Sequence, residues 1–223
     1  MEKKISEEDY FLLTIIKEAG VRWCNETWKL LECELQDKRL LSDKSVIGAL
    51  NRVGNDYCWN FFCDMVERLP MTKSAYKNGL RHAWVHGRGE GDRRADEMFI
   101  EVGLQNLMNA KERKIFEGLP EMLTIYRGCN KIEFETKCFG NSWTWRRDVA
   151  EYFAFRGKGC KEEDGSVFSA VINKNDIWAL LEERNEHEIV CPPCAYDAEK
   201  VKLVTDKRTE YFREYADFIN KRT

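Results

Sequence analysis

The sequence predicts an α+β protein, in which a helical N-terminal region is followed by a region that mixes strands with helices. In the first half of the chain, apolar residues recur at helical spacing. From Glu117 onward the apolar runs become short and alternate with polar residues, as strands require. We therefore expect a helical region over residues 1–117 and a mixed region over 118–223, which together form one compact unit.

Helices are expected throughout the N-terminal region. The first begins at Ser6, which acidic residues follow, and its apolar residues continue at helical spacing to Ala19. Pro70 should end a later helix, because proline has no backbone N–H to donate. Further helices are expected over Trp23–Leu35, Ser45–Leu69, Ser74–His86 and Asp92–Phe116.

Strands and helices should alternate in the second region. The candidate strands are short apolar runs, namely Leu123–Arg127, Lys137–Thr144, Val167–Ile172, Glu186–Cys191 and Lys200–Val204. The candidate helices have apolar residues at helical spacing, and they are Arg146–Phe155, Asp176–Glu183 and Thr209–Ile219. Within the first of these helices, Val149, Ala150 and Phe153 are expected to be buried.

Composition argues against several classes of protein. The formal net charge of -3 gives no whole-protein argument for nucleic-acid binding, which calls for a basic excess. The nine cysteines are odd in number and irregularly spaced, which favours reduced thiols over a disulfide framework. The N-terminus does not resemble a secretion signal, and no stretch approaches the roughly 18 apolar residues of a membrane span. We therefore expect a cytoplasmic protein that does not engage a membrane.

Some patterns with known chemical uses have simpler explanations in this chain. Cys191 and Cys194 form a CxxC pair, but the two prolines between them favour a chain-reversing turn over a redox site. His82 and His86 have metal-compatible spacing but lack the adjacent glutamate of the zincin pattern, so no metal is expected. The glycine-rich segment 87–91 follows no predicted strand, which favours a flexible loop over a phosphate loop.

Short segments of the second region carry the candidate chemistry, and the first contains Arg127 and Gly128. A guanidinium at a strand end can bind a diphosphate through charge-assisted hydrogen bonds. The glycine lets a ligand approach the backbone closely. The competing interpretation is an arginine in a surface ion pair.

The second segment is Ser142-Trp143-Thr144. On a strand, Ser142 and Thr144 face one side and Trp143 faces the other. Two hydroxyls can then line a polar cleft while the indole enters the core. The competing interpretation is an ordinary strand that carries two hydroxyl side chains.

The third segment contains Glu186 and Glu188, which period-two alternation places on one face of a strand. The Ile-Val pair that follows should be buried. The two carboxylates would then lie side by side next to a buried run, where their like charges are expected to repel each other. Paired carboxylates are what glycosyl chemistry uses. The competing interpretation is a solvated strand start.

The chain carries three motifs in a fixed order: Tyr-Arg-Gly, then Ser-x-Thr followed by Ala-x-x-Phe-Ala, then Glu-x-Glu followed by Ile-Val. This ordered set resembles the Arg-Ser-Glu, cholera-toxin-like class of mono-ADP-ribosyltransferases. The likeness covers roughly residues 120–205, and the helical N-terminal region is similar to one that many bacterial members carry. The chain departs from the class at Trp143 and Thr144, where many members read Ser-Thr-Ser. The resemblance implies a core of two small packed sheets with NAD in the cleft between them.

The resemblance also implies roles for single residues. Arg127 would bind the diphosphate of NAD, and the backbone of Gly128 would meet the nicotinamide carboxamide. Ser142 would orient Glu188, which would bind the nicotinamide ribose, while Thr144 would support the same wall. Glu186 would orient or deprotonate the acceptor. An aromatic ring of Tyr152, Phe153 or Phe155 would lie near nicotinamide, and Phe153 is our candidate for it.

The function implied is cleavage of NAD at the nicotinamide N-glycosidic bond and transfer of ADP-ribose to a macromolecule. Glu-x-Glu in this class tends to accompany arginine acceptors, which favours transfer over hydrolysis, and the expected acceptor is a protein. An NAD glycohydrolase needs the same Glu188 and stays open. Two further functions also stay open, namely a non-catalytic domain that binds a partner, such as an inhibitor, and an enzyme that modifies nucleic acid.

Overall fold

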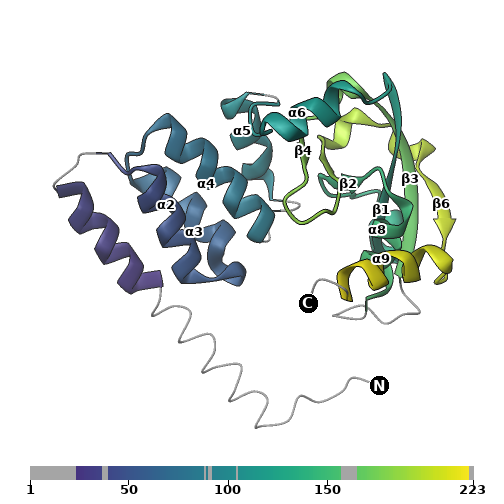
Figure 1. Ribbon diagram of the computed structural model, residues 1–223, viewed down its shortest axis with the longest axis horizontal. Helices are drawn as coiled ribbons and strands as arrows, with labels where there is room; N and C mark the ends of the chain where they lie inside the picture. Colours follow the sequence, from purple (N-terminus) through teal and green to yellow (C-terminus); the bar gives the residue numbers. More distant parts are fainter. Residues whose placement is uncertain are drawn as a thin grey trace, which may run out of the picture. The chain divides into compact units, whose positions relative to one another are not determined.

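The computed structural model describes residues 24–36, 40–87, 89, 92–103, 105–156 and 165–220, and Figure 1 labels its helices and strands. The chain divides into two compact units, Met1–Gly89 and Glu90–Thr223. The described part of the first unit is helical, and the second unit is α+β with one antiparallel sheet. The helix expected from Ser6 to Ala19 lies outside the described residues.

The first unit consists of a helix over 24–36 followed by α2 (Asp43–Val53), α3 (Asn55–Arg68) and α4 (Lys73–His86). Ser42 and Thr72 cap α2 and α4, because each side chain accepts a hydrogen bond from a backbone N–H of the first turn. The core of this unit is apolar and fully buried at Val46, Ala49, Leu50, Phe62, Cys63, Met65, Leu80 and Ala83.

The single helix expected over Ser45–Leu69 is wrong, because the chain forms two helices there. Gly54 separates them with a φ of +76°, which a right-handed helix does not adopt. Glycine reaches this conformation without the penalty that a Cβ would impose.

The second unit begins with α5 (Arg93–Val102) and α6 (Ala110–Glu117). The sequence predicted one helix over Asp92–Phe116, and this prediction is also wrong. Gly103 ends α5 with a φ of +87°, and Asn109 then starts α6 in a reciprocal capping box with Glu112.

These two helices are bound to the sheet of the second unit, so the division of the chain falls before them and not at residue 117. The Asn141 amide donates to Asp96 of α5 at 2.7 Å. The buried carboxylate of Glu112 in α6 accepts from the backbone N–H of Glu182 at 2.9 Å. The expected boundary marked the change from helices to strands, whereas the second compact unit begins at Glu90 and includes two helices before its first strand.

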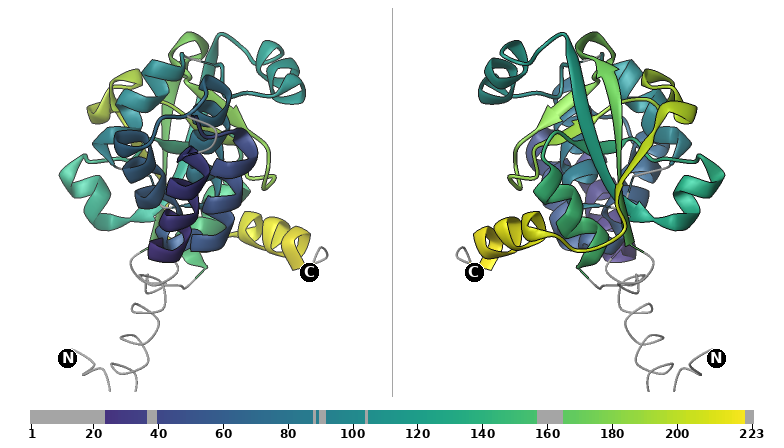
Figure 2. Two further views of the ribbon diagram at one scale, coloured as in Figure 1. Left: turned by 90° about the vertical axis from the view of Figure 1, so that its left-hand side faces the viewer. Right: turned by 90° about the vertical axis from the view of Figure 1, so that its right-hand side faces the viewer.

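The sheet has the strand order β4-β5-β2-β1-β3-β6. Figure 2 shows its long strands β1 and β3 side by side. The strands are β1 (Met122–Asn130), β2 (Ser142–Thr144), β3 (Gly165–Asn173), β4 (Ala179–Leu181), β5 (Glu188–Val190) and β6 (Lys202–Thr205).

Two predicted elements of this unit differ from those observed. Of the strand expected over Lys137–Thr144 only β2 forms, and the chain before it forms the short helix α7 (Lys131–Thr136). The helix expected over Asp176–Glu183 is wrong, since a 3-10 turn (Lys174–Asp176) leads into β4. The three residues of β4 are all buried, and their backbone pairs with β5. The predicted helix would have left one face exposed and its backbone unable to pair with a strand.

The sheet is one continuous sheet, and this corrects the expectation of two separate packed sheets. Its two halves are joined narrowly, because the pairing of β1 with β2 consists of Tyr126 opposite Thr144. Beyond this pair the two strands diverge.

The divergence is explained by α8 (Arg147–Phe155), which packs against β1. Gly128 allows this packing, because a Cβ there would lie 2.0 Å from the carbonyl oxygen of Ala150 and 2.6 Å from the backbone nitrogen of Ala154. Ala150, Ala154 and Phe155 then form a buried cluster with Val167 of β3. The C-terminal helix α9 (Glu210–Asn220) packs on α8.

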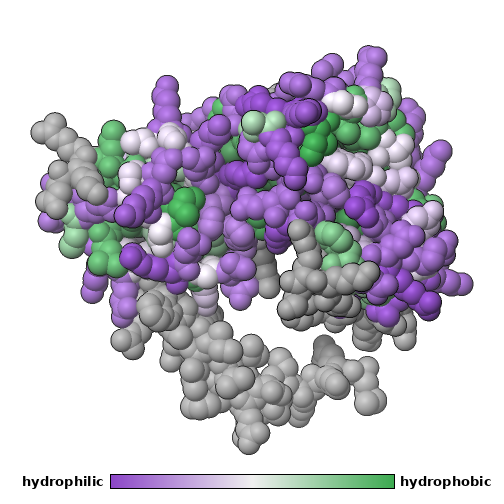
Figure 3. Space-filling view, in the orientation of Figure 1, coloured by the Kyte–Doolittle hydropathy of each residue, from purple (hydrophilic) through white to green (hydrophobic). Residues whose placement is uncertain are grey.

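Figure 3 shows hydrophilic residues over most of the face in view. Of the described helices, none has both the length and the apolar character that crossing a bilayer requires. The exposed large apolar side chains are Leu30, Leu40, Ile100, Met122, Ile132, Val171, Leu203 and Phe218.

We predict that Gly128→Ala destabilises the protein by about 3 kcal/mol, the upper end of the usual cost of overpacking, because the atoms that a methyl group would meet belong to the backbone of α8. The matched control is Gly48→Ala in α2, where no atom lies within 4 Å of the new Cβ. The control should gain about 0.5–1 kcal/mol from reduced backbone entropy in the unfolded chain. Urea denaturation of the three proteins measures both effects, and equal stabilities of the two variants would contradict the packing described.

Candidate functional site

The candidate site lies where the two halves of the sheet diverge. Arg127 lies within β1, and the strand continues beyond it to Asn130, so this arginine does not end the strand as expected. Its Nη1 donates to the carbonyl oxygen of Ser142 at 2.6 Å. Its Nε and Nη2 contact Oε2 of Glu133 at 2.8 and 2.7 Å. The guanidinium therefore ties β1 to β2 and α7, and its side chain is only 10% exposed.

Ser142 and Glu188 contact each other on the neighbouring strands β2 and β5. The Ser142 hydroxyl donates to Oε1 of Glu188 at 2.6 Å, which is the hydrogen bond that the resemblance led us to expect. Both residues are half-buried. A hydroxyl that donates to a carboxylate favours its ionised form and fixes its orientation.

Trp143 and Thr144 follow the alternation expected of a strand. Trp143 is 2% exposed, and its ring packs on Tyr196 with the ring centroids 4.9 Å apart. The Thr144 hydroxyl donates to the carbonyl oxygen of Glu186 at 2.9 Å and accepts from the backbone N–H of Arg146 at 3.1 Å. Thr144 thus holds the segment before Glu188 against β2.

Glu186 lies before β5, so the expectation that Glu186 and Glu188 alternate on one strand is wrong. Arg184 donates to Oε2 of Glu186 from Nε at 3.1 Å and from Nη2 at 2.7 Å. The Glu186 side chain is 17% exposed. Burial raises the pKa of Glu186 above its ordinary value, against the opposing effect of Arg184 and Arg156.

The alternation fails because the residues on both sides of Glu186 have left-handed backbone conformations. Asn185 has a φ of +56° and His187 a φ of +50°. For residues other than glycine, each such conformation costs on the order of 1–3 kcal/mol and persists where the surroundings hold it. No periodicity in the sequence signals such a turn.

The segment before Glu188 is held by side chains that the sequence did not single out. His187 contacts Glu182 through Nδ1 at 2.7 Å and Arg146 through Nε2 at 3.2 Å. The Trp145 ring lies beside the imidazole, with the centroids 5.0 Å apart. These residues are close to Glu188 in space because β2 and β5 are neighbours.

Gly128 and Phe153 have packing roles in the structure that differ from the expected ones. The missing Cβ of Gly128 is explained by the backbone of α8, which approaches within 2.0 Å of the Cβ position. Phe153 was expected to be buried, but it is half-buried, and the Arg156 guanidinium lies 4.5 Å from its ring centroid. The buried aromatic residue of α8 is Phe155.

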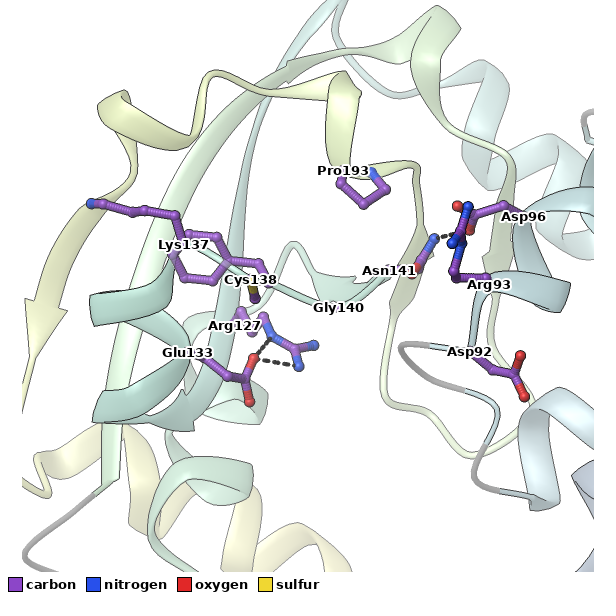
Figure 4. A pocket seen from close by; sticks show the side chains of 11 residues that line it. Asp92, Arg93, Asp96, Arg127, Glu133, Lys137, Cys138, Gly140, Asn141 and Pro193 are labelled. Atoms are coloured by element: carbon purple, nitrogen blue, oxygen red, sulfur yellow. Dashed lines mark hydrogen bonds and ion pairs between the residues drawn. The ribbon is translucent and has the colours of Figure 1, made fainter.

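A cleft of about 570 Å³ opens on the Arg127 side of the sheet, within the second unit. Figure 4 shows Arg127 bound to Glu133 on one side of this cleft and Asn141 bound to Asp96 on another. The cleft is lined by side chains of both charges and a few apolar ones, namely Asp92, Arg93, Asp96, Arg127, Glu133, Lys137, Cys138, Phe139, Gly140, Asn141 and Pro193. Ser142 follows Asn141 directly in the chain, and neither Ser142 nor Glu188 is among the residues that line this cleft.

Glu133 is a residue that the sequence could have revealed. Asn130 stands three residues before it, and the Asn130 side chain accepts from the backbone N–H of Glu133 at 3.1 Å. This Asn-x-x-Glu spacing is a helix-start pattern and would have predicted α7, which lies between the two strands that the sequence predicted. Asp96 gives no comparable signal, because only the fold brings it to Asn141.

The described residues show neither a metal centre nor a disulfide. No cluster of three or more His, Cys, Asp or Glu among them could hold a metal ion. Their eight cysteines are free thiols, and burial raises the pKa of Cys58 to about 12. No family model, curated protein or solved structure matches the chain.

We predict that Glu186→Gln removes a pH dependence of stability. Because folding raises the pKa of Glu186, the folded protein holds this proton to higher pH than the unfolded chain does. The stability of the native protein should therefore fall as the pH rises from the ordinary glutamate pKa through the raised one. Over this window the variant should gain stability relative to the native protein.

Urea denaturation between about pH 4 and pH 8 measures this difference. Glu199→Gln is the matched control, because it makes the same change from a carboxylate to an amide at an exposed position. A Glu186→Gln difference that is the same at every pH would contradict the raised pKa.

Proposed function

We propose that this protein is an NAD-dependent mono-ADP-ribosyltransferase that cleaves the bond between nicotinamide and ribose. The observation that carries the proposal is the 2.6 Å hydrogen bond from Ser142 to Glu188. It brings together two residues that the sequence motifs marked separately. A half-buried carboxylate oriented by a hydroxyl is suited to a reaction that develops positive charge on a sugar.

In the proposed reaction, Glu188 accepts a hydrogen bond from the 2′-hydroxyl of the nicotinamide ribose. The glycosidic C–N bond breaks, nicotinamide leaves with the bonding electron pair, and positive charge develops on the ribose C1′ and ring oxygen. The Glu188 carboxylate stabilises this charge, as carboxylates do in glycoside hydrolysis. Ser142 keeps the carboxylate correctly oriented through the transition state.

The cleft beside Arg127 suits the adenosine diphosphate part of NAD. Its volume of about 570 Å³ is in the range of small-molecule sites. The diphosphate would approach the Arg127 guanidinium and compete with Glu133 for its N–H groups. The backbone of Gly128 and the Phe153 ring remain candidates for the nicotinamide end.

The proposed role of Glu186 is to orient or deprotonate the acceptor. Burial raises the pKa of this carboxyl, which makes its carboxylate a stronger base than an exposed glutamate. The Glu186 carboxylate already binds one guanidinium, since Nη2 of Arg184 lies 2.7 Å from Oε2 of Glu186. An arginine of an acceptor protein could replace Arg184 there, so a protein is the acceptor that the chemistry favours.

The same ion pair favours the second candidate, an NAD glycohydrolase. Arg184 occupies Oε2 of Glu186, so a macromolecular acceptor has to displace it to bind that oxygen. Water needs only Glu188 and space at C1′. The two activities share the cleavage step and differ in what attacks the ribose.

We predict that Glu188→Gln lowers the rate of nicotinamide release from NAD by about 10²–10³, the usual cost of removing a preorganised electrostatic group. The amide oxygen still accepts from Ser142, so the variant should fold like the native protein. Glu121→Gln is the control, because Glu121 is exposed and precedes β1. Nicotinamide release that is equal in Glu188→Gln and the native protein would contradict the proposal.

We predict that Glu186→Gln lowers transfer of labelled ADP-ribose to proteins of a cell lysate by at least 10-fold more than it lowers release of free ADP-ribose. The reason is that Glu186 acts on the acceptor, while Glu188 acts on NAD. Both products are measured in one reaction with labelled NAD. Equal losses of both products would remove the acceptor role, and free ADP-ribose without labelled protein would identify the glycohydrolase.

A further inference from the structure

A chain of hydrogen-bonded side chains crosses the segment before Glu188, and His187 is its middle member. Nδ1 of His187 lies 2.7 Å from Oε1 of Glu182, and Nε2 lies 3.2 Å from Nη1 of Arg146. The imidazole is 22% exposed, and the Glu182 side chain is 8% exposed. The proposed NAD cleavage gives His187 no role.

The two partners determine which ring nitrogen of His187 carries the proton. The guanidinium of Arg146 has donors and no acceptor, so Nε2 must accept from it. The carboxylate of Glu182 accepts, so Nδ1 must donate to it. A neutral imidazole protonated on Nδ1 satisfies both contacts. In an imidazolium Nε2 also carries a proton, and this N–H would point at an N–H of Arg146.

Both ends of this chain of side chains are fixed by buried carboxylates. The backbone N–H of Glu182 donates to Glu112, which is 0% exposed. Arg146 donates to both oxygens of Asp148, which is 5% exposed. On the α9 side, Tyr215 and Glu214 add to the effect of Asp148 in raising the pKa of Arg146. His187 therefore joins two residues, Glu182 and Arg146, that each have a hydrogen bond to a further partner, Glu112 and Asp148.

The imidazole contacts also explain how the backbone of His187 is held in its left-handed conformation. This residue, with a φ of +50°, is followed directly by Glu188, the first residue of β5. The contacts to Glu182 and Arg146 fix the side chain, and the Thr144 hydroxyl fixes the preceding carbonyl group. The orientation of the chain at residue 187 determines where the Glu188 carboxylate meets Ser142.

We propose that His187, as a neutral imidazole protonated on Nδ1, is a positioning residue that bridges Glu182 and Arg146 and thereby holds Glu188 against Ser142. The consequence for catalysis rests on the proposed function, but the tautomer and the bridge do not. Because both ring nitrogens are engaged, His187 acts through Glu188 and does not itself transfer a proton.

Two substitutions test the bridge without straining the backbone. In His187→Gly, glycine adopts the left-handed conformation readily and the ring is lost. In His187→Asn, asparagine tolerates this conformation and retains a donor for Glu182, but its short amide does not reach Arg146. His86→Asn in α4 is the matched control, because it removes a histidine of the helical unit that has no part in the site.

The first measurement is the long-range ¹H–¹⁵N spectrum of the side chains of the native protein at neutral pH. The chain has three histidines, so the His187 signals are those that disappear in His187→Asn and persist in His86→Asn. We expect a protonated Nδ1 and an unprotonated Nε2. A proton on Nε2, or on both nitrogens, would overturn the inference.

The second measurement is the steady-state kinetics of NAD cleavage. His187→Gly and His187→Asn should lower kcat by about 10²-fold with a nearly unchanged KM, as expected when a reacting group is misplaced while the substrate still binds. An unchanged kcat in His187→Gly, or a loss confined to KM, would refute the positioning role. His86→Asn should match the native protein in both constants.

If the native protein does not cleave NAD, the proposed function fails and the bridge is judged separately. The ¹³C signal of the Glu188 carboxyl then reports its hydrogen bond to Ser142. This signal should shift in His187→Gly and stay in place in His86→Asn. A Glu188 signal that is the same in all three proteins would count against the inference.

Discussion

The sheet of the second unit depends on the side chain of Arg127, which links β1 to β2 where backbone pairing between these two strands stops. β1 and β2 pair at Tyr126 and Thr144, and continued register would bring Gly128 opposite Ser142. Instead, α8 lies against Gly128, and the strands separate. Arg127 then donates to the carbonyl oxygen of Ser142 across the opening. A charged group in this position, only 10% exposed, needs a counter-charge, and Glu133 supplies it.

The functional features follow from this opening. One half of the sheet, β2 with β5, carries Ser142 and Glu188, and the other half presents Arg127 to the cleft. The segment before Glu188 is held in an unfavourable backbone conformation by Thr144 and by the contacts of His187. Strain that the surroundings impose at one carboxylate is typical of a preorganised site. Arg127 thus has a structural role, in addition to its proposed role in binding a diphosphate.

Local patterns in the sequence predicted those parts of the fold that depend on neighbours in the chain. The α+β class is confirmed, and the alternation at Ser142, Trp143 and Thr144 places the indole in the core as predicted. The breaks at Gly54 and Gly103 were missed because apolar periodicity continues across both glycines, and helical spacing outweighed the turn signal. β4 was missed because a short apolar run is consistent with a buried strand or a helix, and only its pairing with β5 decides between them.

Of the candidate site, one contact was predictable, but the geometry of the segment around Glu186 was not. The hydrogen bond from Ser142 to Glu188 was expected from the resemblance and is present. The separation of Glu186 from the strand could not be predicted, because it depends on the left-handed backbone of His187. That conformation depends in turn on Glu182 and Arg146, which become its neighbours only when β2 and β5 pair.

The most direct test of the central claim is a crystal structure of Glu188→Gln with NAD. This variant should retain the hydrogen bond from Ser142 and bind the dinucleotide without cleaving it. The account predicts density for NAD with the nicotinamide ribose against residue 188 and the diphosphate at Arg127. NAD bound elsewhere on the protein, or no bound NAD at millimolar concentration, would contradict the account.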